Sequence, residues 1–251
     1  MRRFGRCRGV SFLFLILFLG VLERSAHALT LVPANIDKGM MKFQLGYSNS
    51  DNSKATTEDP TIIESLLLTY GLSEAFEVSG LAGIGQIQNL SSGVKINGTP
   101  TIYGGSLKYL LTAYIPEKPP VDVALTLGYT YAAVSFDASG TKTDASTATT
   151  TYGVVVSKDA PLDVWPYRII PYGGFNMNSS TASATQSGST STGSETLRSL
   201  DVGIRFPFSP EFWFLAEYNN MSGYTNTTAL KDSTTTTWVV GAAYYFNMLT
   251  K

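Results

Sequence analysis

The chain has 251 residues, with 18 Lys and Arg against 19 Asp and Glu, one Cys and one His. Beyond the arginines at positions 2 to 8 the chain has no basic cluster, which argues against binding to nucleic acid. A single Cys excludes a disulfide framework, so stability must come from buried surface or from a membrane.

The N-terminus has the three parts of a secretory signal peptide. Four arginines lie between positions 2 and 8, an apolar run covers positions 10 to 22, and Ala26-His27-Ala28 forms a small-x-small cleavage site. The apolar run is shorter than the roughly 20 residues of a transmembrane helix. We expect residues 1–28 to be removed with the only Cys and the only His, which leaves 13 Lys and Arg against 18 Asp and Glu.

Residues 29–251 are expected to form one β domain, because apolar and polar residues alternate along them with the period of a strand. The fifth predicted strand is the clearest, since every odd position from Val121 to Tyr131 is apolar or aromatic. It has the about 9–11 residues that a tilted strand needs to cross a bilayer. The alternation predicts ten strands, or eight if the sixth and seventh are one irregular excursion. The ten are Gly39–Ser48, Thr61–Tyr70, Phe76–Ile87, Thr101–Tyr114, Val121–Phe136, Thr150–Ser157, Tyr167–Met177, Thr196–Phe206, Glu211–Asn220 and Thr235–Asn247.

The predicted connections alternate in length. Short turns follow the even strands, whereas longer polar loops follow the odd ones, at Ser50–Pro60, Gln88–Pro100, Asp137–Thr149, Asn178–Glu195 and Met221–Thr234. An even strand number with short turns at one end and longer loops at the other is typical of bacterial outer-membrane barrels. A secreted β-sandwich has the same alternation of residues, with its apolar face turned to a core.

Aromatic residues gather near the predicted strand ends, which fits two interfacial girdles of a membrane barrel. One set is Tyr70, Phe76, Tyr114, Phe206, Phe208, Phe212 and Phe246, and the other is Tyr47, Tyr103, Tyr131, Tyr152, Phe175, Tyr224 and Trp238. The predicted fold is therefore an all-β, transmembrane, antiparallel up-and-down barrel over residues 29–251.

Two stretches carry a resemblance to outer-membrane β-barrel proteins of the small opacity-protein and outer membrane protein A type. Thr69–Gly80 (TYGLSEAFEVSG) resembles their strand–turn–strand hairpins. Trp238–Phe246 (WVVGAAYYF) resembles their C-terminal assembly signal, with Gly241, Tyr244 and Phe246 at the Gly-x-x-aromatic-x-aromatic spacing. The resemblance implies recognition by the barrel-assembly machinery, although Asn247–Lys251 extends past the Phe that usually ends the signal.

Charged residues on the polar faces of the predicted strands are expected to point into the barrel, as a structural network or as the lining of a pore. They are Lys42, Glu77, Lys108, Asp122, Asp201, Arg205 and Glu217. A pair of the carboxylates could act as acid and base, but pairing with the interior cations is the simpler expectation. Without His or Cys, residues 29–251 lack imidazole bases and thiol ligands, so we expect no catalytic residue, metal site or cofactor.

The sequence thus predicts a non-enzymatic protein of the bacterial outer membrane with a structural or surface-interaction role. Its expected partners are outer-membrane lipid and the assembly machinery, without nucleic acid, and its oligomeric state stays open. The alternatives are a narrow diffusion channel for small polar solutes and, third, a secreted soluble β-sandwich.

Overall fold

A computed structural model describes residues 38–52, 61–86, 98–117, 119–138, 141–158, 160–162, 165–209, 211–224 and 234–247. The predicted signal peptide, residues 1–28, lies outside these ranges. No helix within them is long and apolar enough to cross a membrane.

The described part of the chain is almost entirely β-structure. The strands are β1 (Met40–Asn52), β2 (Thr61–Gly71), β3 (Phe76–Gln86), β4 (Thr101–Leu110), β5 (Asp122–Ala138), β6 (Thr141–Ser157), β7 (Ala160–Leu162), β8 (Trp165–Gln186), β9 (Ser189–Pro207), β10 (Phe212–Tyr224) and β11 (Thr234–Asn247). One 3-10 helix, η1, covers Leu111–Tyr114.

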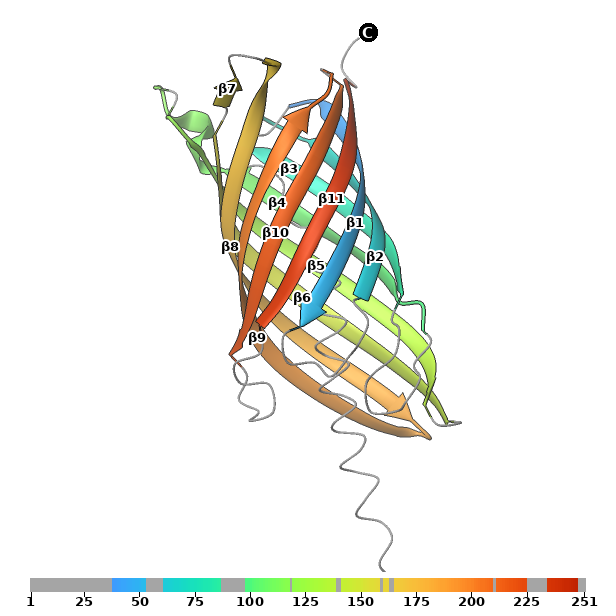
Figure 1. Ribbon diagram of the computed structural model, residues 1–251. Coiled ribbons are helices and arrows are strands. Elements are labelled where there is room, and N and C mark those ends of the chain that lie inside the picture. The colour runs from blue at the N-terminus through green and yellow to red at the C-terminus, as the bar shows by residue number, and fades with distance from the viewer. Residues whose placement is uncertain are drawn as a thin grey trace, which may run out of the picture.

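The strands close into an antiparallel barrel of ten (Figure 1). Each long strand pairs with its neighbours in the chain, β1 pairs with β11, and β6 pairs with β8, whereas β7 lies outside the ring and pairs only with β8. Closure confirms the prediction of ten strands and excludes eight. A path that starts at Phe246 of β11 and moves from each residue to its partner on the next strand returns to β11 at Thr234. The two residues are twelve positions apart, and this stagger means that the strands are tilted against the barrel axis.

Two names describe the ends of this barrel. The "terminal end" is the one where β1 begins, β11 ends and the chain turns from β2 to β3 and from β9 to β10. The "hairpin end" is the opposite one, where β5 is followed by β6 and β8 by β9. Four strands, β5, β6, β8 and β9, extend past the others at the hairpin end (Figure 1).

Side chains alternate between the two faces of the wall, as expected for strands. The outer face carries apolar side chains that are more than half exposed: Leu45, Leu107, Leu127, Leu200 and Val240. Their neighbours along the chain point inward and are small or polar, for example Gln44 beside Leu45. So large an exposed apolar surface indicates contact with another apolar phase.

The prediction of loops over Asp137–Thr149 and Asn178–Glu195 is wrong, because both stretches are mostly strand. β5 and β6 stay paired up to Ala138 and Thr141, and β8 and β9 up to Gln186 and Ser189. Ser187 and Gly188 have φ angles of +50° and +77°, and two positive values are typical of a type I′ hairpin turn. The apolar alternation is missing here because neither face is covered by apolar side chains.

The fourth strand is also shorter than expected. It ends at Leu110, and the residues up to Tyr114 form η1 instead. Pairing with β5 stops at the Leu110–Ala124 pair, and the prolines at 116, 119 and 120 favour departure from the sheet. The Thr112 hydroxyl fixes η1 to the start of β5, since it accepts from the Val123 N–H at 3.3 Å and donates to Asp122 at 3.4 Å.

Candidate functional site

A cluster of three charges lies inside the barrel towards the terminal end. Lys42 of β1, Glu77 of β3 and Lys108 of β4 are all buried. The Lys42 Nζ lies 2.5 Å from one carboxylate oxygen of Glu77, and the Lys108 Nζ lies 2.7 Å from the other. The Lys42–Glu77 bond passes over the intervening strand β2, so it ties together strands that do not pair.

Arg205 of β9 continues this group across the interior. Its guanidinium carbon lies 3.8 Å from the centre of the Trp213 ring and 5.2 Å from that of Tyr245, which is close enough for cation–π attraction. The Lys42 ammonium lies 5.7 Å from the same Tyr245 ring. Charged and aromatic side chains from six strands therefore meet in one connected cluster.

A second polar group lies on β8, β9 and β10. Tyr172 of β8 donates a hydrogen bond of 2.9 Å to Glu217 of β10. Asp201 of β9 accepts from Asn176 at 2.7 Å, from Ser199 at 3.2 Å and from Asn219. All of these side chains are buried, so the carboxylates exchange water for hydrogen bonds from the protein.

Two glycines make room for these inward side chains. Gly203 lies opposite Tyr172 in the β8–β9 register, and a Cβ at this position would come within 2.3 Å of the tyrosine ring. Gly153 of β6 lies opposite Asn176, whose amide oxygen would be only 1.8 Å from a Cβ there. The sequence therefore places a residue without a side chain opposite each of these two interior side chains.

An apolar cluster closes the interior beside these polar groups. It consists of Leu110, Ala124, Val155, Tyr172 and Leu215, which come from β4, β5, β6, β8 and β10, with Ala113 of η1 packed against it. Side chains from both halves of the wall thus meet in the lumen. Together with the Arg205 cluster they fill the lumen towards the terminal end.

The structure places six of the predicted interior charges on buried inward positions: Lys42, Glu77, Lys108, Asp201, Arg205 and Glu217. Asp122 lies apart from them, half-buried at the start of β5 and bonded to Thr112. Sequence reasoning missed the aromatic members Tyr172, Trp213 and Tyr245, because it searched the polar faces for charges alone. In the described residues no group of three or more His, Cys, Asp or Glu is arranged to hold a metal ion.

The predicted assembly signal lies on β11. Tyr244 and Phe246 are exposed on the outer face with stacked rings 6.3 Å apart, whereas Gly241 lies opposite Gly46 of β1. A Cβ at Gly241 would come 2.8 Å from the Leu45 carbonyl oxygen, so this position requires glycine for close strand approach. Recognition of these residues by an assembly machinery stays a prediction.

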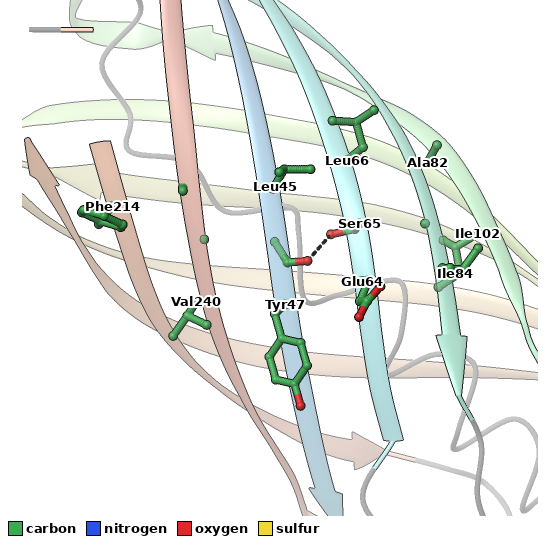
Figure 2. Close-up of a pocket in the computed structure, with 14 residues that line it drawn as sticks. Leu45, Tyr47, Glu64, Ser65, Leu66, Ala82, Ile84, Ile102, Phe214 and Val240 are labelled. Carbon is green, nitrogen blue, oxygen red and sulfur yellow. Dashed lines mark hydrogen bonds between the residues drawn. The ribbon is translucent and has the colours of Figure 1, made fainter. Parts of the chain in front are cut away.

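Figure 2 shows a hollow on the outer face of β1, β2 and β3, lined by Leu45, Leu66, Ala82 and Ile84, with a volume of about 750 Å³. Glu64 of β2 is exposed at this hollow, between Tyr47 of β1 and Ile84 of β3 in the register. It is the one carboxylate among the hollow's lining residues.

Aromatic side chains form a girdle on the outer face, towards the hairpin end. The tyrosines and tryptophan at 47, 103, 129, 152 and 238 are each 40–61% exposed. Tyr103 and Tyr131 pair across β4 and β5 with ring centres 5.1 Å apart, and Tyr218 and Trp238 pair across β10 and β11 at 4.7 Å. Beyond this girdle, the outward positions of β8 are Ser and Thr, and those of β6 and β9 are Ser, Thr and Ala with the charged residues Lys142, Asp144 and Arg198.

A model of the family of unknown function DUF6588 matches residues 76–249. No curated protein matches the chain. Among solved structures, Ail, the attachment invasion locus protein of Yersinia pestis, is 17% identical, with 84% of this chain and 100% of that chain covered and a TM-score of 0.39. The translocator domain of the autotransporter NalP from Neisseria meningitidis is 9% identical over 96% and 97%, with a TM-score of 0.48. The outer membrane protease OmpT from Escherichia coli is 11% identical over 88% and 100%, with a TM-score of 0.47.

Proposed function

The chain belongs to DUF6588, a family of unknown function, and we propose that it is a non-enzymatic, integral barrel of the bacterial outer membrane with a closed lumen. Its role is interaction at the cell surface, through the strands that extend at the hairpin end. The main support for this proposal is that side chains occupy the lumen. A barrel without a pore does not conduct, so its function depends on its external surface.

The outer face supports insertion in a membrane. Exposed leucines and valines cover the wall between Phe246 near the terminal end and the girdle residues Tyr47 and Trp238. An apolar band flanked by aromatic residues is the outer surface of a bacterial outer-membrane barrel. The short turns then face the periplasm, and the hairpin end faces outward.

The interior argues against a diffusion channel. Ten strands are close to the about eight at which side chains just fill a barrel, and far from the 16–18 of a porin. The apolar cluster around Leu110 and Leu215 and the cation–aromatic cluster around Arg205 both project into the lumen. A hydrated ion would have to displace both.

Single-channel recording in planar bilayers tests the closed lumen. We expect no conductance steps from the wild-type protein, and steps from the triple variant Leu110→Ala, Tyr172→Ala and Leu215→Ala, which removes the apolar cluster. Heat-modifiable migration in detergent gels verifies that both proteins are folded. Conductance of the wild type would overturn the proposal, and a folded but silent triple variant would show that this cluster is not what closes the barrel.

Glu64→Leu is expected to stabilise the inserted barrel by up to about 1 kcal/mol, because a carboxylate on the lipid face near an interface carries a small cost. Urea unfolding from lipid vesicles measures this change. Ile84→Val on the facing strand is the control for a small change in shape at the same hollow. A loss of stability in Glu64→Leu would show that the carboxylate has a favourable partner.

A further inference from the structure

The extension at the hairpin end carries a polar outer face. β5, β6, β8 and β9 run past the girdle as one antiparallel sheet (Figure 1). Its outward positions are mostly Ser, Thr and Ala, and the exposed charges on this part of β6 are Lys142 and Asp144. Hydroxyl groups therefore outnumber charged groups on this face.

This face is hollowed over β5, β6 and β8. The hollow has a volume of about 600 Å³, and it is lined by polar and apolar groups in similar measure. Ala133 forms its floor, with Thr101 of β4 and Ser146 of β6 on either side in the register. Tyr131, whose ring is tilted against that of Tyr103, forms the edge towards the girdle.

The polar groups of the hollow are held in place by one another. Ser135 donates to Asp144 at 2.5 Å, and the Lys142 ammonium lies 3.6 Å from the same carboxylate oxygen. The hydroxyls of Ser146 and Ser183 are bonded at 3.0 Å. The hydrogen bond from Ser135, with Lys142 nearby, lowers the pKa of Asp144, so this carboxylate stays an acceptor under mildly acidic conditions.

We propose that this hollow binds a neutral oligosaccharide, an inference that rests on the proposed function because it requires the hairpin end to face outward. A pyranose ring has an apolar C–H face and a rim of hydroxyl groups. The C–H face fits the small apolar floor at Ala133 and the ring of Tyr131. The rim fits hydroxyls that both donate and accept, at Ser146, Ser183 and Thr185, and the carboxylate of Asp144, which accepts.

The lining argues against other ligand classes. A phosphate or sulfate group would meet the Asp144 carboxylate, which is one of the lining residues. An apolar ligand would leave the hydroxyls without water, at a cost for each buried polar group. A sugar can come from two sources, the lipopolysaccharide that surrounds the barrel or a free glycan outside the cell.

The test uses the full-length protein in phosphatidylcholine nanodiscs that lack lipopolysaccharide. Two neutral probes, maltohexaose and the hexose oligosaccharide of the lipopolysaccharide outer core, are titrated by saturation-transfer NMR. We expect saturable binding of at least one probe. Ala133→Trp fills the floor and is expected to weaken binding by about tenfold or more, whereas Ser194→Trp, outward on β9 and outside the hollow, changes it by less than about twofold.

A second arm separates the two sources. Wild-type protein is reconstituted with intact lipopolysaccharide that carries the complete outer core and is titrated again. Loss of binding of the free probes identifies the surrounding lipopolysaccharide as the ligand, and unchanged binding identifies a free glycan. Absence of binding by both probes, or equal binding by wild type and Ala133→Trp, would overturn the inference.

These outcomes are separate from those of the channel recordings. A wild-type barrel that conducts and also binds sugar overturns the closed lumen alone. A silent barrel that binds no sugar overturns the oligosaccharide site alone.

Discussion

Glu77→Gln is expected to destabilise the folded barrel by about 3–5 kcal/mol, the cost of removing one partner from a buried ion pair. The Glu77 carboxylate bonds two ammonium groups, Lys42 at 2.5 Å and Lys108 at 2.7 Å. An amide at this position leaves two buried positive charges facing each other without a compensating negative charge. Urea unfolding of the protein from lipid vesicles, followed by tryptophan fluorescence, measures the change.

Glu74 supplies the matched control in the neighbouring turn. Its carboxylate lies 3.7 Å from the Lys38 ammonium, but the two side chains are 72% and 56% exposed. Glu74→Gln is therefore expected to cost less than about 1 kcal/mol, as for other surface pairs. Equal effects of the two substitutions would show that the interior cluster is hydrated and contributes no more than a surface pair.

A compensated variant tests the physical reason. Lys42→Met, Glu77→Leu and Lys108→Met together remove all three charges and keep similar volumes. Replacement of a complete buried ion cluster by apolar groups is often neutral or stabilising. We expect the triple variant to be at least as stable as the wild type, although Glu77→Gln alone is not. A triple variant as unstable as Glu77→Gln would indicate that the cluster also fixes strand register.

The membrane-facing part of the fold is predictable from the sequence because a strand in lipid must alternate. Met41, Phe43, Leu45 and Tyr47 occupy every second position of β1, so the spacing predicts that they share one face. The outward direction of that face follows only when the strand is taken as part of a membrane barrel. The same rule also brings the inward charges Lys42 and Glu77 to one lumen. It does not predict that they touch, because their contact across β2 depends on the register and tilt of the closed barrel.

The extended hairpins could not be found from apolar periodicity. Between Thr143 and Thr151, and between Asn178 and Glu195, both faces of the sheet carry Ser, Thr, Ala and Gly. Two signals were nevertheless present in the sequence, the strand preference of Thr and the Ser187-Gly188 dipeptide at the turn. The interior aromatic Tyr172 was hidden for a related reason, since Ile169 and Ile170 before it break the alternation.

Leu127→Arg is expected to destabilise the inserted barrel by about 2–4 kcal/mol, the cost of a lipid-facing arginine at the bilayer midplane. Leu127 is 51% exposed on the outer face of β5, where it lies between Leu107 and Tyr152 in the register. Leu125 and Leu127 are the two leucines in the outward series of β5, which runs from Val123 near the terminal end to Tyr131, so this side chain lies inside the apolar band.

Thr181→Arg is the control, because Thr181 is exposed on the outer face of β8, six residues beyond Phe175 towards the hairpin end. Near or above the interface the same cation is expected to cost about 0–1 kcal/mol. Both variants are compared with the wild type by urea unfolding from phospholipid vesicles, and then in detergent, where the difference between them should shrink. Equal costs in vesicles would mean that the wall around Leu127 does not face lipid, because only depth in a bilayer distinguishes the two outward positions.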